Sequence, residues 1–132
     1  MSHHYHAIVW IDHHEARIFE FNEEEADKAV VKPKHPVKHL HTKGGSLSSW
    51  RAPEDKAYFK SVADHLKPVH EILIVGPANA KLAFVKYLHD QERGISDKVV
   101  GVESVDHPTD GQLVHFARNY FKSADRMLPQ VD

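Results

Sequence analysis

Two short, continuous apolar runs constrain the fold of this chain more than any other feature. Glu71 to Val75 reads EILIV and is ended by Gly76-Pro77, and His6 to Ile11 reads HAIVWI. Short runs without alternation are typical of strands that are buried on both faces of a sheet. A helical pattern over Ala78 to Asp90 and an apolar stretch over Lys98 to Val102 follow. This strand, helix, strand order predicts a parallel pair joined by a right-handed crossover.

The rest of the N-terminal half favours antiparallel strands. Ala16 to Phe21 alternates between two sets of side chains, so we expect it to pair with the first apolar run as a hairpin. The acidic segment Asn22 to Asp27 is predicted to be a solvated loop. A third strand is expected to begin over Lys28 to Lys32. Because proline cannot donate to a strand ladder, Pro33 and Pro36 make it either an edge strand or a strand that breaks there.

Three helices are expected in the second half. Pro53 suits a first helical position, and apolar residues recur at helical spacing as far as Leu66. In the helix after Gly76-Pro77, we expect Leu82, Val85 and Leu88 to face inward. Thr109 to Gln112 has the spacing of a capping box, and we expect the last helix over Leu113 to Ala124.

These elements predict a single α/β domain over residues 1–132. Its mixed five-stranded sheet with flanking helices would have a ribonuclease H-like layout. The length of 132 residues suits one domain with a genuine core. The absence of cysteine excludes disulfides and is compatible with a reducing cytoplasm. No apolar run approaches the roughly 20 residues that cross a bilayer, and we find no signal peptide, so we expect a cytoplasmic protein without membrane contact.

A basic segment between the third strand and the first helix is the strongest functional signal. Lys28 to Lys43 contains five lysines, three histidines and no acid, and Gly44-Gly45 follows it directly. Such an arm with a glycine tip suits insertion into a polyanion, so we predict contact with RNA or the ribosome. Lysines that protect a solvated edge strand are the structural alternative. The predicted nucleic-acid-binding residues are Lys32, Lys34, Lys38, Lys43, Gly44, Gly45, Ser46 and Arg51.

A second candidate is the turn after the buried strand. Ligands of open α/β sheets bind at the carboxyl ends of strands, where a helix N-terminus offers free N–H groups. Gly76 and Lys81 are therefore predicted to bind a phosphate group. The alternative is a strand-to-helix turn that needs glycine for its backbone alone.

A metal-dependent hydrolase or nuclease is the rival hypothesis from another class. His35, His39 and His41 have the same parity, and three imidazoles can hold zinc. Asp12 ends the first strand, where a catalytic carboxylate would lie, but it equally suits a turn. Our leading interpretation requires neither a metal nor a cofactor.

Two stretches resemble a known family. They are Lys38 to Ser46, KHLHTKGGS, and Ile72 to Leu88, ILIVGPANAKLAFVKYL. Together with the order of elements, they resemble the central domain of the archaeal and eukaryotic peptide-chain release factor and of Pelota. Small bacterial homologues of this domain are usually called translational machinery proteins.

The resemblance implies a fold, the ribosome as a partner and a functional tip at Gly44-Gly45. In the release factors the tip is Gly-Gly-Gln and reaches the peptidyl-transferase centre of the ribosome. Gly44 and Gly45 match that motif, whereas Ser46 replaces the glutamine. Pelota lacks the motif and acts without hydrolysis, so the resemblance favours a non-catalytic role. A third hypothesis is an interaction module that only shares the fold and forms a homo-oligomer through the edge at Ala29 to Lys32.

Overall fold

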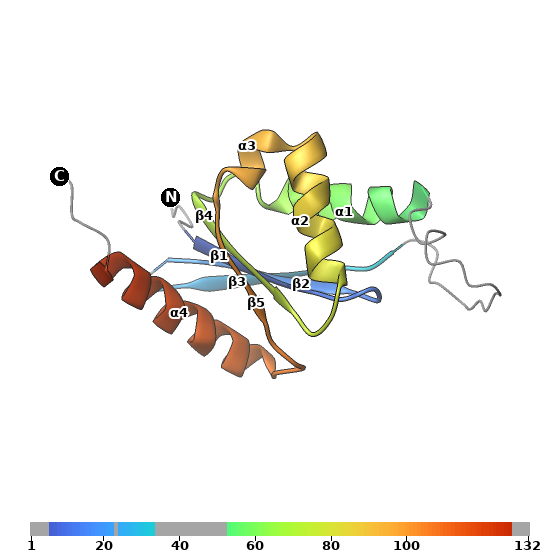
Figure 1. Cartoon of the computed structure of the whole chain (residues 1–132). Coiled ribbons are helices and arrows are strands. Elements are labelled where there is room, and N and C mark those ends of the chain that lie inside the picture. The colour runs from blue at the N-terminus through green and yellow to red at the C-terminus, as the bar shows by residue number, and fades with distance from the viewer. Residues whose placement is uncertain (1–5, 23, 34–52, 128–132) are drawn as a thin grey trace.

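A computed structural model describes residues 6–22, 24–33 and 53–127 of the chain. The described part contains five strands and four helices, which form an α/β sandwich (Figure 1). In chain order they are β1 (His6–Ile11), β2 (Ala16–Phe21), β3 (Ala26–Val31), α1 (Pro53–His65), β4 (Glu71–Gly76), α2 (Ala80–Gln91), α3 (Arg93–Ser96), β5 (Val99–Ser104) and α4 (Asp110–Met127).

The sheet has the order β3-β2-β1-β4-β5. β3, β2 and β1 are antiparallel neighbours, whereas β1, β4 and β5 run parallel. The predicted mixed five-stranded sheet, the N-terminal hairpin and the parallel pair β4–β5 are therefore confirmed. The two apolar runs became adjacent central strands, which explains why both lack alternation: each is covered on both faces.

Helices cover both faces of the sheet (Figure 1). On one face, α1 and α2 bury a core around Phe59, Leu66 and Phe84. On the other face, α4 packs its Leu113 and Phe121 against side chains of β1, β2 and β4. No helix in the described residues is long and apolar enough to cross a membrane.

The structure corrects three local predictions. The acidic loop is shorter than expected, because β3 begins at Ala26. The Asn22 side chain makes this tight turn, since its Oδ1 accepts hydrogen bonds from the backbone N–H groups of Glu24 and Glu25 at 2.8 and 2.9 Å. In α2, Leu82 is 54% exposed rather than inward, while Phe84 and Leu88 are buried. The helix begins two residues later than predicted, at Ala80.

The predicted capping box of α4 is confirmed, although the helix begins at Asp110 rather than at Leu113. The Thr109 N–H donates to Gln112 Oε1 at 2.9 Å, and the Gln112 N–H donates to Thr109 Oγ1 at 3.1 Å. These bonds satisfy two donors that have no partner inside the helix. The capping box therefore stabilises the first turn of α4.

Candidate functional site

The described residues on either side of 34–52, the range that holds most of the basic segment, lie at one end of the sheet. Val31, the last residue of β3, pairs with Ala16 at the start of β2. On the other side of the segment, Tyr58 of α1 donates from its hydroxyl to the Asp12 carbonyl oxygen at 2.9 Å. The chain therefore leaves the sheet beside the β1–β2 turn and returns to the same turn. Lys32 lies at this exit and is exposed.

Most of the predicted nucleic-acid site falls outside the described residues. The residues concerned are Lys34, Lys38, Lys43, Gly44, Gly45, Ser46 and Arg51. Lys28, within β3, is described. Its Nζ donates to Asp110 Oδ2 at 2.6 Å, so it ties the edge strand to α4.

The predicted phosphate site lies at the carboxyl end of β4, where the structure places both of its residues. Gly76 is pressed against β1, since a Cβ there would lie 2.3 Å from the Ile11 carbonyl oxygen. Lys81 is buried and donates from Nζ to the Ala78 carbonyl oxygen at 2.6 Å. The glycine thus meets a packing requirement, and the lysine fastens the turn between β4 and α2.

Asp12 forms a turn, as one of the two interpretations of the sequence predicted. Its Oδ1 accepts hydrogen bonds from the backbone N–H groups of His14 and Glu15 at 2.8 and 2.9 Å. His107, after β5, lies nearby with its Nε2 4.0 Å from Asp12 Oδ2. Among the described residues, no three histidine or carboxylate side chains gather closely enough to hold a metal ion. The three histidines of the metal hypothesis, His35, His39 and His41, lie outside those residues.

An ion-pair network that sequence reasoning missed joins β2 and β3 to α4. The Arg17 guanidinium donates to Asp110 Oδ1 at 2.8 Å and to the Pro108 carbonyl oxygen at 3.0 Å. It also lies 4.6 Å from the centroid of the Trp10 ring. The hydrogen bonds from Lys28 and then Arg17 hold the pKa of the Asp110 carboxyl below its ordinary range. The available signal was the alternation of β2, which puts Arg17 on the same face as Phe19 and Phe21.

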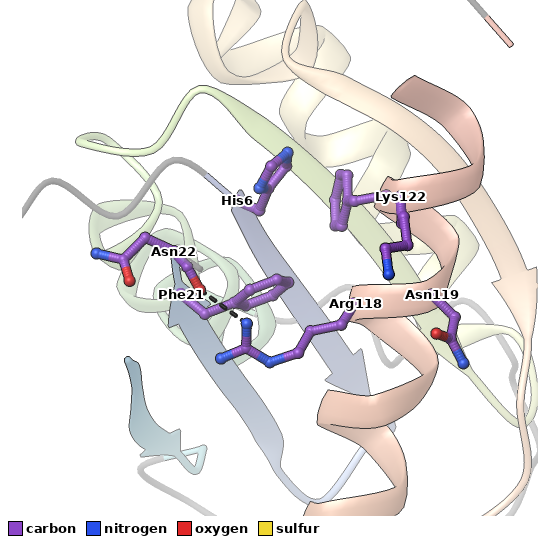
Figure 2. Close-up of a pocket in the computed structure, with 7 residues that line it drawn as sticks. His6, Phe21, Asn22, Arg118, Asn119 and Lys122 are labelled. Carbon is purple, nitrogen blue, oxygen red and sulfur yellow. Dashed lines mark hydrogen bonds between the residues drawn. The ribbon is translucent and has the colours of Figure 1, made fainter. Parts of the chain in front are cut away.

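A cavity of about 380 Å³ opens at the start of β1 and the end of β2, away from the turn that joins these strands (Figure 2). His6 and Phe21, which pair across the hairpin, and Asn22 line it from the sheet. Four residues of α4 complete the wall: Arg118, Asn119, Phe121 and Lys122. The sequence showed no sign of this cavity, because Asn22 and Arg118, on its two walls, are 96 residues apart in the chain.

Comparison with known proteins gives a likeness of fold. No protein-family model matches the chain, and no curated protein sequence does. The structure is similar to Pelota from Archaeoglobus fulgidus, with a TM-score of 0.60 and 12% identity over 86% of this chain and 30% of that one. Pelota from Thermoplasma acidophilum gives a TM-score of 0.59 and 22% identity over 89% of this chain and 34% of that one.

The archaeal translation termination factor aRF1 gives a TM-score of 0.54 and 14% identity over 91% of this chain and 39% of that chain. This chain therefore spans about a third of the length of these solved structures. The TM-scores show a shared fold. At such low identities the likeness shows nothing finer. The fold expected from the resemblance, that of a release-factor-like domain, is confirmed.

Proposed function

We propose that this protein is a non-catalytic, translation-related protein that contacts RNA or the ribosome through its basic segment. The observation that carries the proposal is the fold shared with Pelota and with a translation termination factor over most of this chain. Membership of the bacterial translational machinery proteins is part of the same proposal.

The position of the described residues that flank the basic segment supports this function. Lys32 is exposed where the chain leaves the sheet, and the chain returns beside the same turn through Tyr58. The lysines between these two points would contact phosphates, while Gly44-Gly45 would permit close approach of the backbone. The turn at Gly76 and Lys81 is the weaker part, since a phosphate there would have to displace the bond from Lys81 to Ala78.

The salt dependence of RNA affinity tests the proposal. We expect a variant in which Lys34, Lys38 and Lys43 are all replaced by Gln to bind single-stranded RNA and purified ribosomes more weakly than the wild type. Each phosphate neutralised on a single strand contributes about 0.7 to the slope of log K against log salt, so the slope should flatten by about 2. Fluorescence anisotropy over a series of salt concentrations measures both quantities.

The matched control instead removes three lysines that lie on or next to α1 and α2. Lys60, Lys67 and Lys86 are exposed and pair with Asp64 or Asp90 on their own side of the molecule. Replacing them with Gln changes the net charge equally, but should leave most of the slope intact. Equal losses in the two variants, or no RNA binding by the wild type at low salt, would contradict the proposal.

Ser46 supports the non-catalytic part of the proposal. Serine is two carbons shorter than glutamine and lacks the amide, so a water molecule held by glutamine in the release factors would be misplaced. Misplacement by about an ångström can cost about a hundredfold in rate. Release of peptide from stalled ribosomes by the wild type, and loss of that release in Gly45→Ala, would show instead that the chain is an enzyme.

A further inference from the structure

Two polar side chains face one another across a gap at the carboxyl end of the parallel strands. Asp12 directly follows β1, and His107 lies between β5 and α4. The Nε2 atom of His107 lies 4.0 Å from Asp12 Oδ2, which is too far for a hydrogen bond. Among the described residues, neither of these two atoms makes a hydrogen bond. The gap is therefore lined by two polar atoms that are available to a ligand.

The other polar atom of each side chain holds that side chain in place. Asp12 Oδ1 accepts hydrogen bonds from the backbone N–H groups of His14 and Glu15 at 2.8 and 2.9 Å. On the other side of the gap, His107 Nδ1 lies 3.0 Å from Asp106 Oδ1. Because a carboxylate can only accept, the hydrogen of a neutral His107 ring belongs on Nδ1. The lone pair of Nε2 is then left for the gap.

The backbone on each side of His107 is tied to the sheet. Trp10 donates from Nε1 to the Asp106 carbonyl oxygen at 2.6 Å, and Arg17 donates to the Pro108 carbonyl oxygen at 3.0 Å. The same connection lines an open hollow of about 320 Å³, which leaves room for an ion with its water molecules. The histidine is thus presented to the gap by a backbone that is held from two sides.

We propose that Asp12 Oδ2 and His107 Nε2 bind a divalent transition-metal ion such as Zn²⁺ or Ni²⁺. Bonds from carboxylate oxygen and imidazole nitrogen to Zn²⁺ are about 2.0 to 2.2 Å long, so one ion can reach both donors across a gap of 4.0 Å. Asp106 matches the carboxylate that orients a metal-binding histidine through its other ring nitrogen. The Arg17 guanidinium is paired with Asp110 and therefore opposes a cation only weakly.

The site has two protein donors, so water would fill the remaining positions around the ion. This agrees with the lack, among the described residues, of a group of three histidine or carboxylate side chains that could hold a metal ion. A proton on Nε2 is the competing occupant of the gap. Because His107 is 63% exposed and an exposed ion pair with Asp12 is weak, a metal ion can displace that proton. The site shares no histidine with the hypothesis based on His35, His39 and His41, and it does not depend on RNA binding.

Quenching of Trp10 fluorescence by Ni²⁺ tests the site in protein that carries Trp50→Phe. The chain has two tryptophans, so this change leaves Trp10 as the only one that emits. The Trp10 ring lies 5.1 Å from the His107 ring, so an ion held by His107 lies close enough to quench it. Zn²⁺ has a filled d shell and does not quench. We expect saturable quenching by Ni²⁺ that excess Zn²⁺ reverses.

Variants of the two donors and of the orienting carboxylate should lose this quenching. His107→Gln should abolish its saturable part. Asp12→Asn and Asp106→Ala should each raise the Ni²⁺ concentration for half-maximal quenching at least about tenfold, the usual effect of losing a group that holds or orients a metal ligand. Asparagine keeps the Oδ1 acceptor that makes the turn after β1, so Asp12→Asn removes the metal donor without removing the turn.

His89→Gln on α2 is the matched control. His89 is also 63% exposed and its Nδ1 lies 3.4 Å from the carboxylate of Asp90, but no second carboxylate faces it among the described residues. This variant should be quenched as its Trp50→Phe parent is. Absence of saturable quenching at millimolar Ni²⁺, quenching that persists in His107→Gln or Asp12→Asn, or an equal loss in His89→Gln would overturn the proposal.

Discussion

Gly76 allows β4 to end in direct contact with the backbone of β1. A Cβ added there would lie 2.3 Å from the Ile11 carbonyl oxygen and 3.4 Å from its carbonyl carbon. Both atoms belong to the backbone of a strand that is paired on each side, so neither can move without disturbing the sheet. The glycine is required by this close approach, whatever ligand the turn binds.

Replacing Gly76 with Ala is therefore expected to lower the free energy of unfolding by about 1 to 3 kcal/mol, the range for overpacking a well-packed core. Gly111→Ala is the control, because a Cβ at that helical position meets nothing within 4 Å. Helix propensity predicts that this second change stabilises the protein by up to about 1 kcal/mol. Urea unfolding of both variants measures the difference, and a Gly76→Ala protein as stable as the wild type would contradict the contact.

The start of α4 is the element that joins the helix to the antiparallel half of the sheet. Its capping box satisfies the first backbone donors, and Asp110 accepts hydrogen bonds from Lys28 of β3 and Arg17 of β2. Lys28 is the larger and Arg17 the smaller cause of the lowered pKa of Asp110. The folded state thus favours the ionised carboxylate more than the unfolded chain does.

Comparing the wild type with Asp110→Asn is expected to show this preference for the ionised carboxylate as a pH-dependent difference in unfolding free energy. A lowered pKa in the folded state contributes stability at neutral pH that is lost as the pH falls through that pKa. The difference in unfolding free energy between wild type and variant should be constant above about pH 5 and decline below about pH 4. It should not exceed about 1 kcal/mol, because the carboxylate is 43% exposed and solvent screens it.

Thermal unfolding between acidic and neutral pH measures that difference. Glu103→Gln on β5 is the control, since the structure gives this exposed carboxylate no ion pair with any other described residue. If the unfolding free energy of the wild type exceeded that of Asp110→Asn by more as the pH falls, the change would have the wrong sign. That result would contradict the lowered pKa of Asp110.

At the scale of the whole molecule, the two edges of the sheet differ in how they resist association. β3 carries Asp27 and Lys28, charges that discourage a further strand from adding. β5 has one charged residue, Glu103, and exposes Val100 and Val102 at 44% and 37%. The β5 edge is therefore the one more prone to pair with another chain.

Val102→Lys is expected to suppress association at high protein concentration, and Val30→Lys on β3 should have a smaller effect. Val30 is a fair control, because its exposed fraction of 45% is similar. Size-exclusion chromatography with light scattering measures the result. The interaction-module hypothesis, with a homo-oligomer formed through Ala29 to Lys32, predicts the reverse order.

Much of the fold could be predicted from the chain alone because its signals are local. The unbroken apolar runs of β1 and β4, the alternation of β2 and the capping box at Thr109 depend on neighbours within a few residues. The regular geometry of strands and helices turns such spacings into elements and buried faces. The order of those elements then limited the ways in which they could pack.

The environments of single side chains depended on packing instead. Alternation could put Arg17 on one face of β2, but only the arrival of α4 brought Asp110 to it. Helical spacing allowed Leu82 to face inward, yet the side of α2 that packs in the structure carries Lys81, Phe84 and Leu88 instead. The cavity beside His6 formed in the same way, from two segments distant in the chain. Contacts of this kind are set by how whole elements meet, and no short window of sequence contains both partners.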